Sequence, residues 1–262
     1  MIDTKRTNNG YAPSTSQTSV GRSSKTSAVE GSRMIVSRVI GALFLAGFLL
    51  YGVGFSMVTS VVGTSNFLST IAASQGILVV GAFMMFMNTG VDLGKAVLFF
   101  PILEKHSKRT ALAYLVTMIV EVVLLDLGVL ALLLIVPLAR HASDAGAQTL
   151  GSILVQTNAM AYQLGEMVLG FGATLLCVLL YRTRLIPRWL AISGLIGYPF
   201  LAAGTIAEVF GVHIGLYLTM PGFFFELVLP AWLIFKGFQP AAYLGQSVVT
   251  AVDEMRVARV SS

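Results

Sequence analysis

Between Val39 and Val91 the chain runs for 53 residues without a charged side chain, and long apolar stretches follow four more times. A membrane-spanning helix needs about 20 predominantly apolar residues, so these stretches provide enough for roughly six helices. Hydrophobic residues make up 56% of the chain and charged residues only 11%, which excludes an ordinary water-soluble domain. Barrel strands are also excluded, because the apolar residues do not alternate with polar ones. We therefore predict an all-α polytopic membrane protein.

The predicted membrane domain covers residues 38–238 and contains six helices. Residues 1–37, which are rich in Ser, Thr and Asn, predict a disordered tail, and residues 239–262 a short C-terminal tail. The first apolar stretch is long enough to span, so it predicts a retained helix and not a cleaved signal peptide. Thr64-Ser65-Asn66 predicts a turn, and residues 138–158 predict one longer loop. The predicted helices are 38–60, 77–103, 110–137, 160–181, 189–210 and 214–235.

Positively charged residues predict the orientation. If the N-terminus is cytoplasmic, 15 of the 17 Lys and Arg residues fall on the cytoplasmic side, where such residues are enriched in membrane proteins. Arg140 is predicted outside, and Lys95 lies within a span. We therefore expect both termini in the cytoplasm and the protein in the cell membrane, as in a bacterial multi-pass protein. The cytoplasmic residues are Lys5, Arg6, Arg22, Lys25, Arg33, Arg38, Lys105, Lys108, Arg109, Arg182, Arg184, Arg188, Lys236, Arg256 and Arg259.

Several ionisable side chains lie inside the predicted helices. Each Asp or Lys costs about 2.5–3.5 kcal/mol at a helix centre, so these groups should face the interior of the bundle and seek partners. Asp92 and Lys95 are three residues apart and can neutralise each other on one helix face. At about 1.5 Å per residue from the cytoplasmic side, one layer about 12–17 Å deep contains Asp92, Lys95, Glu121 and Glu226.

Asp126 and Glu166 fall in a second layer at about 22–24 Å, and Glu208 lies close to the outer surface. Two interpretations apply to these groups. They form a site for a cation, a proton or a polar solute, or they only hydrogen-bond neighbouring helices. A single Lys leaves several carboxyl groups without an opposite charge, which favours a functional site in the first layer. For Glu208 the structural interpretation is favoured.

Two local features point to the same layer. Gly90 and Gly94 flank Asp92 and would let another helix approach beside the carboxylate. Pro230 cannot donate a hydrogen bond to the carbonyl of Glu226, four residues earlier. A free carbonyl beside a carboxylate is how broken transporter helices build cation sites. The alternative is that Pro221 and Pro230 simply bend the helix.

Recognised catalytic and phosphate-binding motifs are missing from the sequence, and Cys177 is the sole cysteine, so we expect no cofactor and no disulfide. His141, Asp144, Glu208 and His213 could meet as a metal site at the outer side, although nothing in their spacing requires it. The net charge of +5 follows from the topology, so we expect the lipid bilayer as the partner and not nucleic acid. The sequence also leaves open whether the protein forms a homo-oligomer, since six helices are few for a secondary transporter.

Two stretches carry a resemblance to a known family. Pro187-Arg-Trp-Leu190 precedes the fifth predicted helix, and the sixth contains Pro221, then Phe225-Glu226, then Trp232-Leu-Ile-Phe-Lys-Gly-Phe238. The chain resembles the bacterial membrane family catalogued as domain of unknown function 4386. The resemblance implies six helices and no particular activity. The family tends to carry an Arg three residues before the acid of its third helix, a place taken here by Met118.

Three classes of function remain open. The first is a small transport or ion-coupling protein in which Asp92, Glu121 and Glu226 bind a cation or proton and Lys95 sets the charge balance. The second is a non-catalytic membrane sensor or assembly accessory whose polar groups only hold helices together. The third is an intramembrane lipid-modifying enzyme using two carboxyl groups as acid and base. No nucleophile or metal motif supports the third class, so an enzyme is not favoured.

Overall fold

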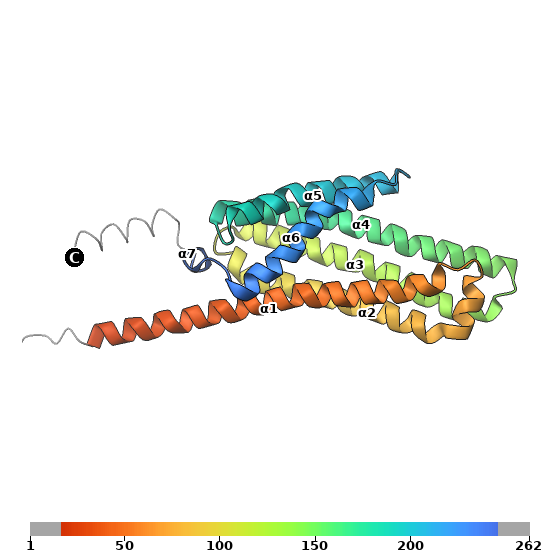
Figure 1. Cartoon of the computed structure of the whole chain (residues 1–262), viewed down its shortest axis with the longest axis horizontal. Coiled ribbons are helices and arrows are strands. Elements are labelled where there is room, and N and C mark those ends of the chain that lie inside the picture. The colour runs from red at the N-terminus through yellow and green to blue at the C-terminus, as the bar shows by residue number, and fades with distance from the viewer. Residues whose placement is uncertain (1–16, 246–262) are drawn as a thin grey trace, which may run out of the picture.

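The computed structural model describes residues 17–245, and this part is helical apart from short turns and contains no strand (Figure 1). Six helices are long and apolar enough to cross a membrane. The all-α, multi-pass prediction is therefore confirmed. The helices are α1 (Gln17–Val62), α2 (Phe67–Leu103), α3 (Lys108–Leu138), the 3-10 turn η1 (Ala139–His141), α4 (Ala145–Thr183), α5 (Arg188–Val209), α6 (Gly215–Phe235) and the short α7 (Pro240–Tyr243).

The six long helices form a closed ring in chain order. Each helix packs against the next one, and α6 returns to pack against α1. Figure 1 shows α6 crossing the bundle obliquely between α5 and α1. Because the ring closes, ionisable side chains on its inner faces are turned toward one another and away from lipid.

The two ends of the bundle differ. The end that carries α7 and the turns 104–107 and 184–187 is called the proximal end here, and the other the distal end (Figure 1). At the distal end the α5–α6 tip stops short of the α3–α4 turn. With 22 and 21 residues, α5 and α6 are about 32 Å long, close to the roughly 30 Å hydrocarbon core. The longer α1–α4 continue past this hairpin.

The predicted loop at 138–158 is wrong, because α4 begins already at Ala145. Likewise α2 begins at Phe67 and not at residue 77, with a break in helical geometry at Ser74. Both segments are rich in small and polar residues, yet they pack tightly: a Cβ on Gly151 would lie 2.8 Å from the Phe67 ring. The turn predicted at residues 64–66 is confirmed.

Helix α1 also begins earlier than predicted. It starts at Gln17, so residues 17–37, assigned above to a disordered tail, continue the first span as a helix. Residues 17–37 contain no proline, and an existing helix extends by one hydrogen bond per added residue without a new nucleation cost. The remainder of the predicted N-terminal tail, and residues 246–262 of the C-terminal one, lie outside the described residues.

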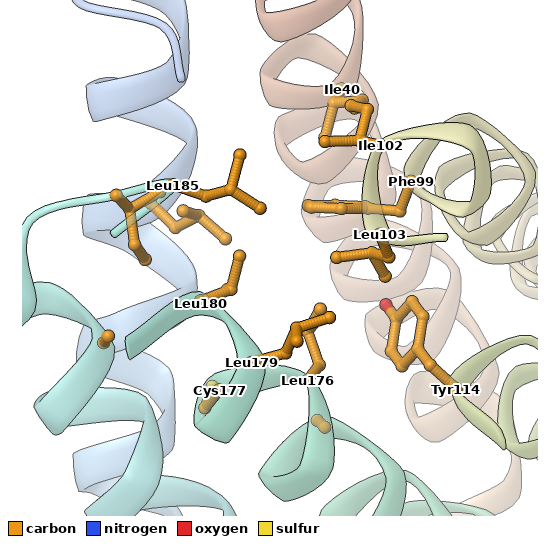
Figure 2. Packing of buried hydrophobic residues seen from close by; sticks show 14 of the residues in the cluster. Ile40, Phe99, Ile102, Leu103, Tyr114, Leu176, Cys177, Leu179, Leu180 and Leu185 are labelled. Carbon is orange, nitrogen blue, oxygen red and sulfur yellow. The ribbon is translucent and has the colours of Figure 1, made fainter. Parts of the chain in front are cut away.

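Two apolar clusters fill the ring. The proximal core joins residues of all six long helices, and Figure 2 shows part of it, with Phe99 and Leu103 of α2 facing Leu176 and Leu180 of α4. The distal core lies among α1–α4 and includes Val58, Leu78 and Leu132. Between the two cores lies the layer of ionisable groups.

The chain after α6 ties the ring together at the proximal end. Gly237 adopts a left-handed conformation with φ of 69°, which ends α6 and turns Phe238 into the proximal core, where it is fully buried. The backbone N–H of Phe238 donates to Ser37 Oγ at 3.1 Å, and Arg33 Nη1 donates to the Phe238 carbonyl. The α1–α6 contact is therefore fixed by polar and apolar interactions at once.

Replacing Phe238 by Ala should lower the free energy of unfolding by about 3–5 kcal/mol, because it leaves a cavity in the proximal core. The measurement is unfolding of the purified protein in mixed micelles of increasing SDS fraction. Phe235→Ala provides the matched control, since the Phe235 side chain is 76% exposed and should change stability by less than about 1 kcal/mol. Equal destabilisation by both substitutions would contradict the assigned packing.

The positions of the basic residues predict that the proximal end faces the cytoplasm. A green fluorescent protein fused after Ser262 should therefore fluoresce, and alkaline phosphatase at the same position should be inactive. Alkaline phosphatase inserted within the α1–α2 turn at residues 64–66 should instead be active. The opposite pattern of reporter activity would show that the orientation is inverted.

Candidate functional site

A cavity of about 180 Å³ lies inside the ring, lined by residues of all six long helices. Its wall contains all four members of the first predicted layer, and Glu166 of the second. Four carboxyl groups and one amine thus share one enclosed space. The ionisable residues that line it are Asp92, Lys95, Glu121, Glu166 and Glu226.

Asp92 and Lys95 of α2 form an ion pair at the base of this space. Lys95 Nζ lies 2.5 Å from Asp92 Oδ1, and both side chains are 11% exposed. Asn88, one turn earlier, donates to Asp92 Oδ2 at 2.8 Å. Lys95 Nζ also lies 4.2 Å from the centroid of the Phe44 ring on α1. The Lys95 ammonium is therefore held by a carboxylate and an aromatic face together.

Gly47 on α1 makes room for this pair. A Cβ at Gly47 would lie 2.9 Å from Asn88 Oδ1, so a larger residue would displace the amide that holds Asp92. The close approach predicted at Gly90 and Gly94 is not found: a Cβ at Gly90 would meet nothing within 4 Å, and one at Gly94 only Leu43 at 3.9 Å. The glycine that matters for the carboxylate is on the neighbouring helix.

Glu226 enters the cavity from α6 and is half-buried. Tyr198 on α5 donates its hydroxyl hydrogen to Glu226 Oε1 at 3.0 Å. Helix α6 runs without a break through Pro221 and Pro230, so a broken-helix site is not found at Glu226. The carboxylate itself, and not an unwound segment of backbone, is what α6 presents to the cavity.

Glu121 on α3 is the most deeply buried acid of the site. Its side chain is only 3% exposed, and its Oε2 atom has no hydrogen-bond partner among the described residues. One turn earlier lies Met118, also buried, which supplies no charge. A buried carboxylate oxygen without a partner is costly, so its presence on a cavity wall marks a position where a ligand or water would be stabilised.

Glu166 lies four residues after Tyr162 on α4, and both line the cavity. The Tyr162 ring stacks on Tyr51 of α1, with centroids 5.6 Å apart and an interplanar angle of 20°. These tyrosines, like Tyr198, were not singled out from the sequence. Their position in the middle of a span could have identified these tyrosines from the sequence, since tyrosine is more typical of the membrane interface.

The remaining acidic candidates lie elsewhere. Asp126 does not line the cavity; it accepts a hydrogen bond from Thr89 at 2.9 Å and links α3 to α2. Glu208 accepts from the backbone N–H of Gly215 at 2.8 Å and lies 2.9 Å from His213 Nδ1, so it caps the start of α6. Both arrangements fit a structural role.

The suggested outer metal site does not assemble. Glu208 and His213 lie at the α5–α6 tip, whereas His141 and Asp144 lie at the α3–α4 turn, which extends farther along the bundle (Figure 1). In residues 17–245 no three His, Cys, Asp or Glu side chains are placed to hold a metal ion.

The cavity borders the proximal core on one side and the α1–α6 seam on another. Tyr114 and Leu176, both labelled in Figure 2, belong to the cavity wall and to the proximal core, which lies between the cavity and the proximal end. Among the lining residues, Phe223 of α6 is the most exposed, at 43%. Its ring meets Phe48 of α1 edge-on, with centroids 5.7 Å apart. The α1–α6 seam beside the cavity is therefore filled by this aromatic pair, and Phe223 also forms part of the outer surface of the bundle.

A scan against protein-family models matches residues 39–237 to the family described as "Domain of unknown function (DUF4386)". The chain belongs to this family. No curated protein and no solved structure matches the chain. The resemblance stated from the sequence is thus confirmed, and it covers nearly the whole membrane domain.

The two motifs that carry the family resemblance meet at the proximal end. Trp189 and Trp232 contact edge-on, with ring centroids 6.4 Å apart, and the N–H of Gln239 donates to the Leu185 carbonyl at 2.9 Å. Pro187 precedes the first turn of α5, and Arg188 lies over the Tyr181 ring. Most of the shared motif residues therefore hold helix ends together, whereas Phe225 and Glu226 line the cavity.

Removing one member of the Asp92–Lys95 pair should be strongly destabilising. Lys95→Met leaves Asp92 without its counter-charge and should cost about 3–5 kcal/mol of unfolding free energy in SDS titration. The double variant Asp92→Asn/Lys95→Met should cost much less than the sum of the single ones, because no uncompensated charge remains. Lys236→Met, at an exposed position, is the control. Additive effects at Asp92 and Lys95 would mean that the pair is not coupled.

Proposed function

We propose that the protein binds a cation or a proton in the cavity among its six helices and transports it or couples to its movement. The observation that carries this proposal is Glu121, which lines the cavity together with three other carboxyl groups and whose buried Oε2 atom has no partner in the described structure. Lys95 neutralises Asp92, which leaves Glu121, Glu166 and Glu226 as surplus acids. A positively charged ligand would remove this imbalance.

Two barriers beside the site fit transport by alternating access. The proximal core borders one side of the cavity, and at the α1–α6 seam the rings of Phe48 and Phe223 are in edge-on contact. With the termini in the cytoplasm, as the basic residues predict, this state is closed toward the cytoplasm. Alternation would require the proximal core and the aromatic pair to open in turn.

Neutralising the surplus acids should abolish cation or proton movement. In proteoliposomes loaded with pH-sensitive or cation-sensitive dyes, Glu121→Gln/Glu226→Gln should lower the initial flux by roughly tenfold or more, corresponding to about 1.4 kcal/mol or more of lost interaction. Asp126→Asn is the matched control, because Asp126 lies on the same helix as Glu121 but outside the cavity. Flux that is unchanged in the double variant, with correctly folded protein, would refute the proposal.

The alternative function is a non-catalytic accessory in which the polar groups only join helices. The Tyr198–Glu226 and Thr89–Asp126 hydrogen bonds favour it, since each links two neighbouring helices. In that case Glu226→Gln should lower the unfolding free energy while proteoliposomes of the native protein show no flux above empty vesicles. The stability and flux measurements together therefore separate the two functions.

A further inference from the structure

We infer that the cavity takes a small organic cation, an alkylammonium or quaternary ammonium ion, which the aromatic wall holds and the surplus carboxylates neutralise. This inference names the ligand class of the site proposed above and rests on that function. It comes from the combination of acids with aromatic rings around one space. Phe44, Phe48, Tyr51, Tyr162, Tyr198 and Phe223 all line the cavity.

Lys95 shows how the wall binds an ammonium group. Its Nζ atom lies 4.2 Å from the Phe44 ring centroid and 2.5 Å from Asp92 Oδ1, both of which line the cavity. An aromatic face and a carboxylate on neighbouring helices are the two elements by which proteins recognise alkylated ammonium ions. The Lys95 side chain is thus an ammonium group that the protein itself binds in this manner.

A second set of the same elements has no resident amine. Tyr162 and Glu166 are one turn apart on α4 and share its cavity-facing side. Tyr51 stacks on Tyr162, and Glu121 of α3, whose buried Oε2 atom has no partner in the described structure, lines the same cavity. Two aromatic rings and two carboxyl groups from α1, α3 and α4 therefore line the cavity without a basic side chain paired to them.

The size and shape of the space favour an organic ion over a bare metal ion. A volume of about 180 Å³ exceeds by an order of magnitude the roughly 10–15 Å³ that one water needs by the same measure. The carboxyl groups are distributed around the wall, and within the described residues no three of the ligand-type side chains converge on a metal position. An organic cation, which is larger than a bare metal ion, can contact several of these carboxyl groups at once.

Isothermal titration of the full-length protein in detergent tests the inference, with tetramethylammonium as the probe. We expect saturable binding of tetramethylammonium, and no binding of the neutral analogue tert-butanol or of K⁺ at the same concentration. Glu121→Gln should weaken tetramethylammonium binding about tenfold, because it removes a buried charge from the site. Tyr162→Leu should weaken it by a similar factor through loss of the aromatic face.

Two substitutions serve as controls for these variants. Asp126→Asn removes an acid from α3 outside the cavity, and Tyr217→Leu removes a tyrosine that is 78% exposed on α6. Each should change the dissociation constant by less than about twofold. A thermal unfolding curve of every variant distinguishes loss of binding from loss of fold.

The outcomes separate this inference from the function on which it rests. If K⁺ or Na⁺ binds as well as tetramethylammonium, the organic ligand class is wrong and the cation site remains. If no cation binds but proton flux still depends on Glu121 and Glu226, the ligand is a proton and the organic class is again wrong. Equal binding of tert-butanol would show that the cavity recognises shape alone, which also overturns the inference.

Discussion

The ion pair between Asp92 and Lys95 is the interaction on which the interior of this protein depends. Two charges in the middle of a lipid-facing helix would oppose membrane insertion, and their mutual contact within a closed ring removes most of that cost. Asn88, Phe44 and the space left by Gly47 complete their surroundings. With these two charges balanced, the other acids of the cavity determine its excess negative charge.

The architecture was largely predictable, because apolar length and basic flanks dominate a membrane sequence. Counting residues along each span also grouped Asp92, Glu121 and Glu226, which line one cavity in the structure. Contacts between helices did not: Gly90 and Gly94 resembled a close-packing motif, yet the relevant glycine is Gly47 on another helix. The distal parts of α2 and α4 were missed because their small and polar residues look loop-like until their packing partners are known.

The set of residues that lines the cavity could not be predicted from residue spacing in the sequence either. Tyr51 and Tyr162 lie 111 residues apart in the sequence, and only the ring closure places their aromatic faces together. The shared family motifs gave no guidance here, since their tryptophans, Arg188 and Phe238 hold the proximal end together. Within those motifs, Glu226 is the ionisable residue that belongs to both the family pattern and the cavity wall, next to Phe225.

Chain order around the ring has a consequence for biogenesis. Neighbouring helices are also consecutive ones, so α1 to α5 can associate one after another as each is inserted, with little cost of closing long loops. Only the seam between α1 and α6 joins the first helix to the last. Until the segment around Gly237 and Phe238 reaches Arg33 and Ser37, the ionised interior stays open on one side. Enclosure of the charges therefore waits for the last of the six long helices and the segment that follows it.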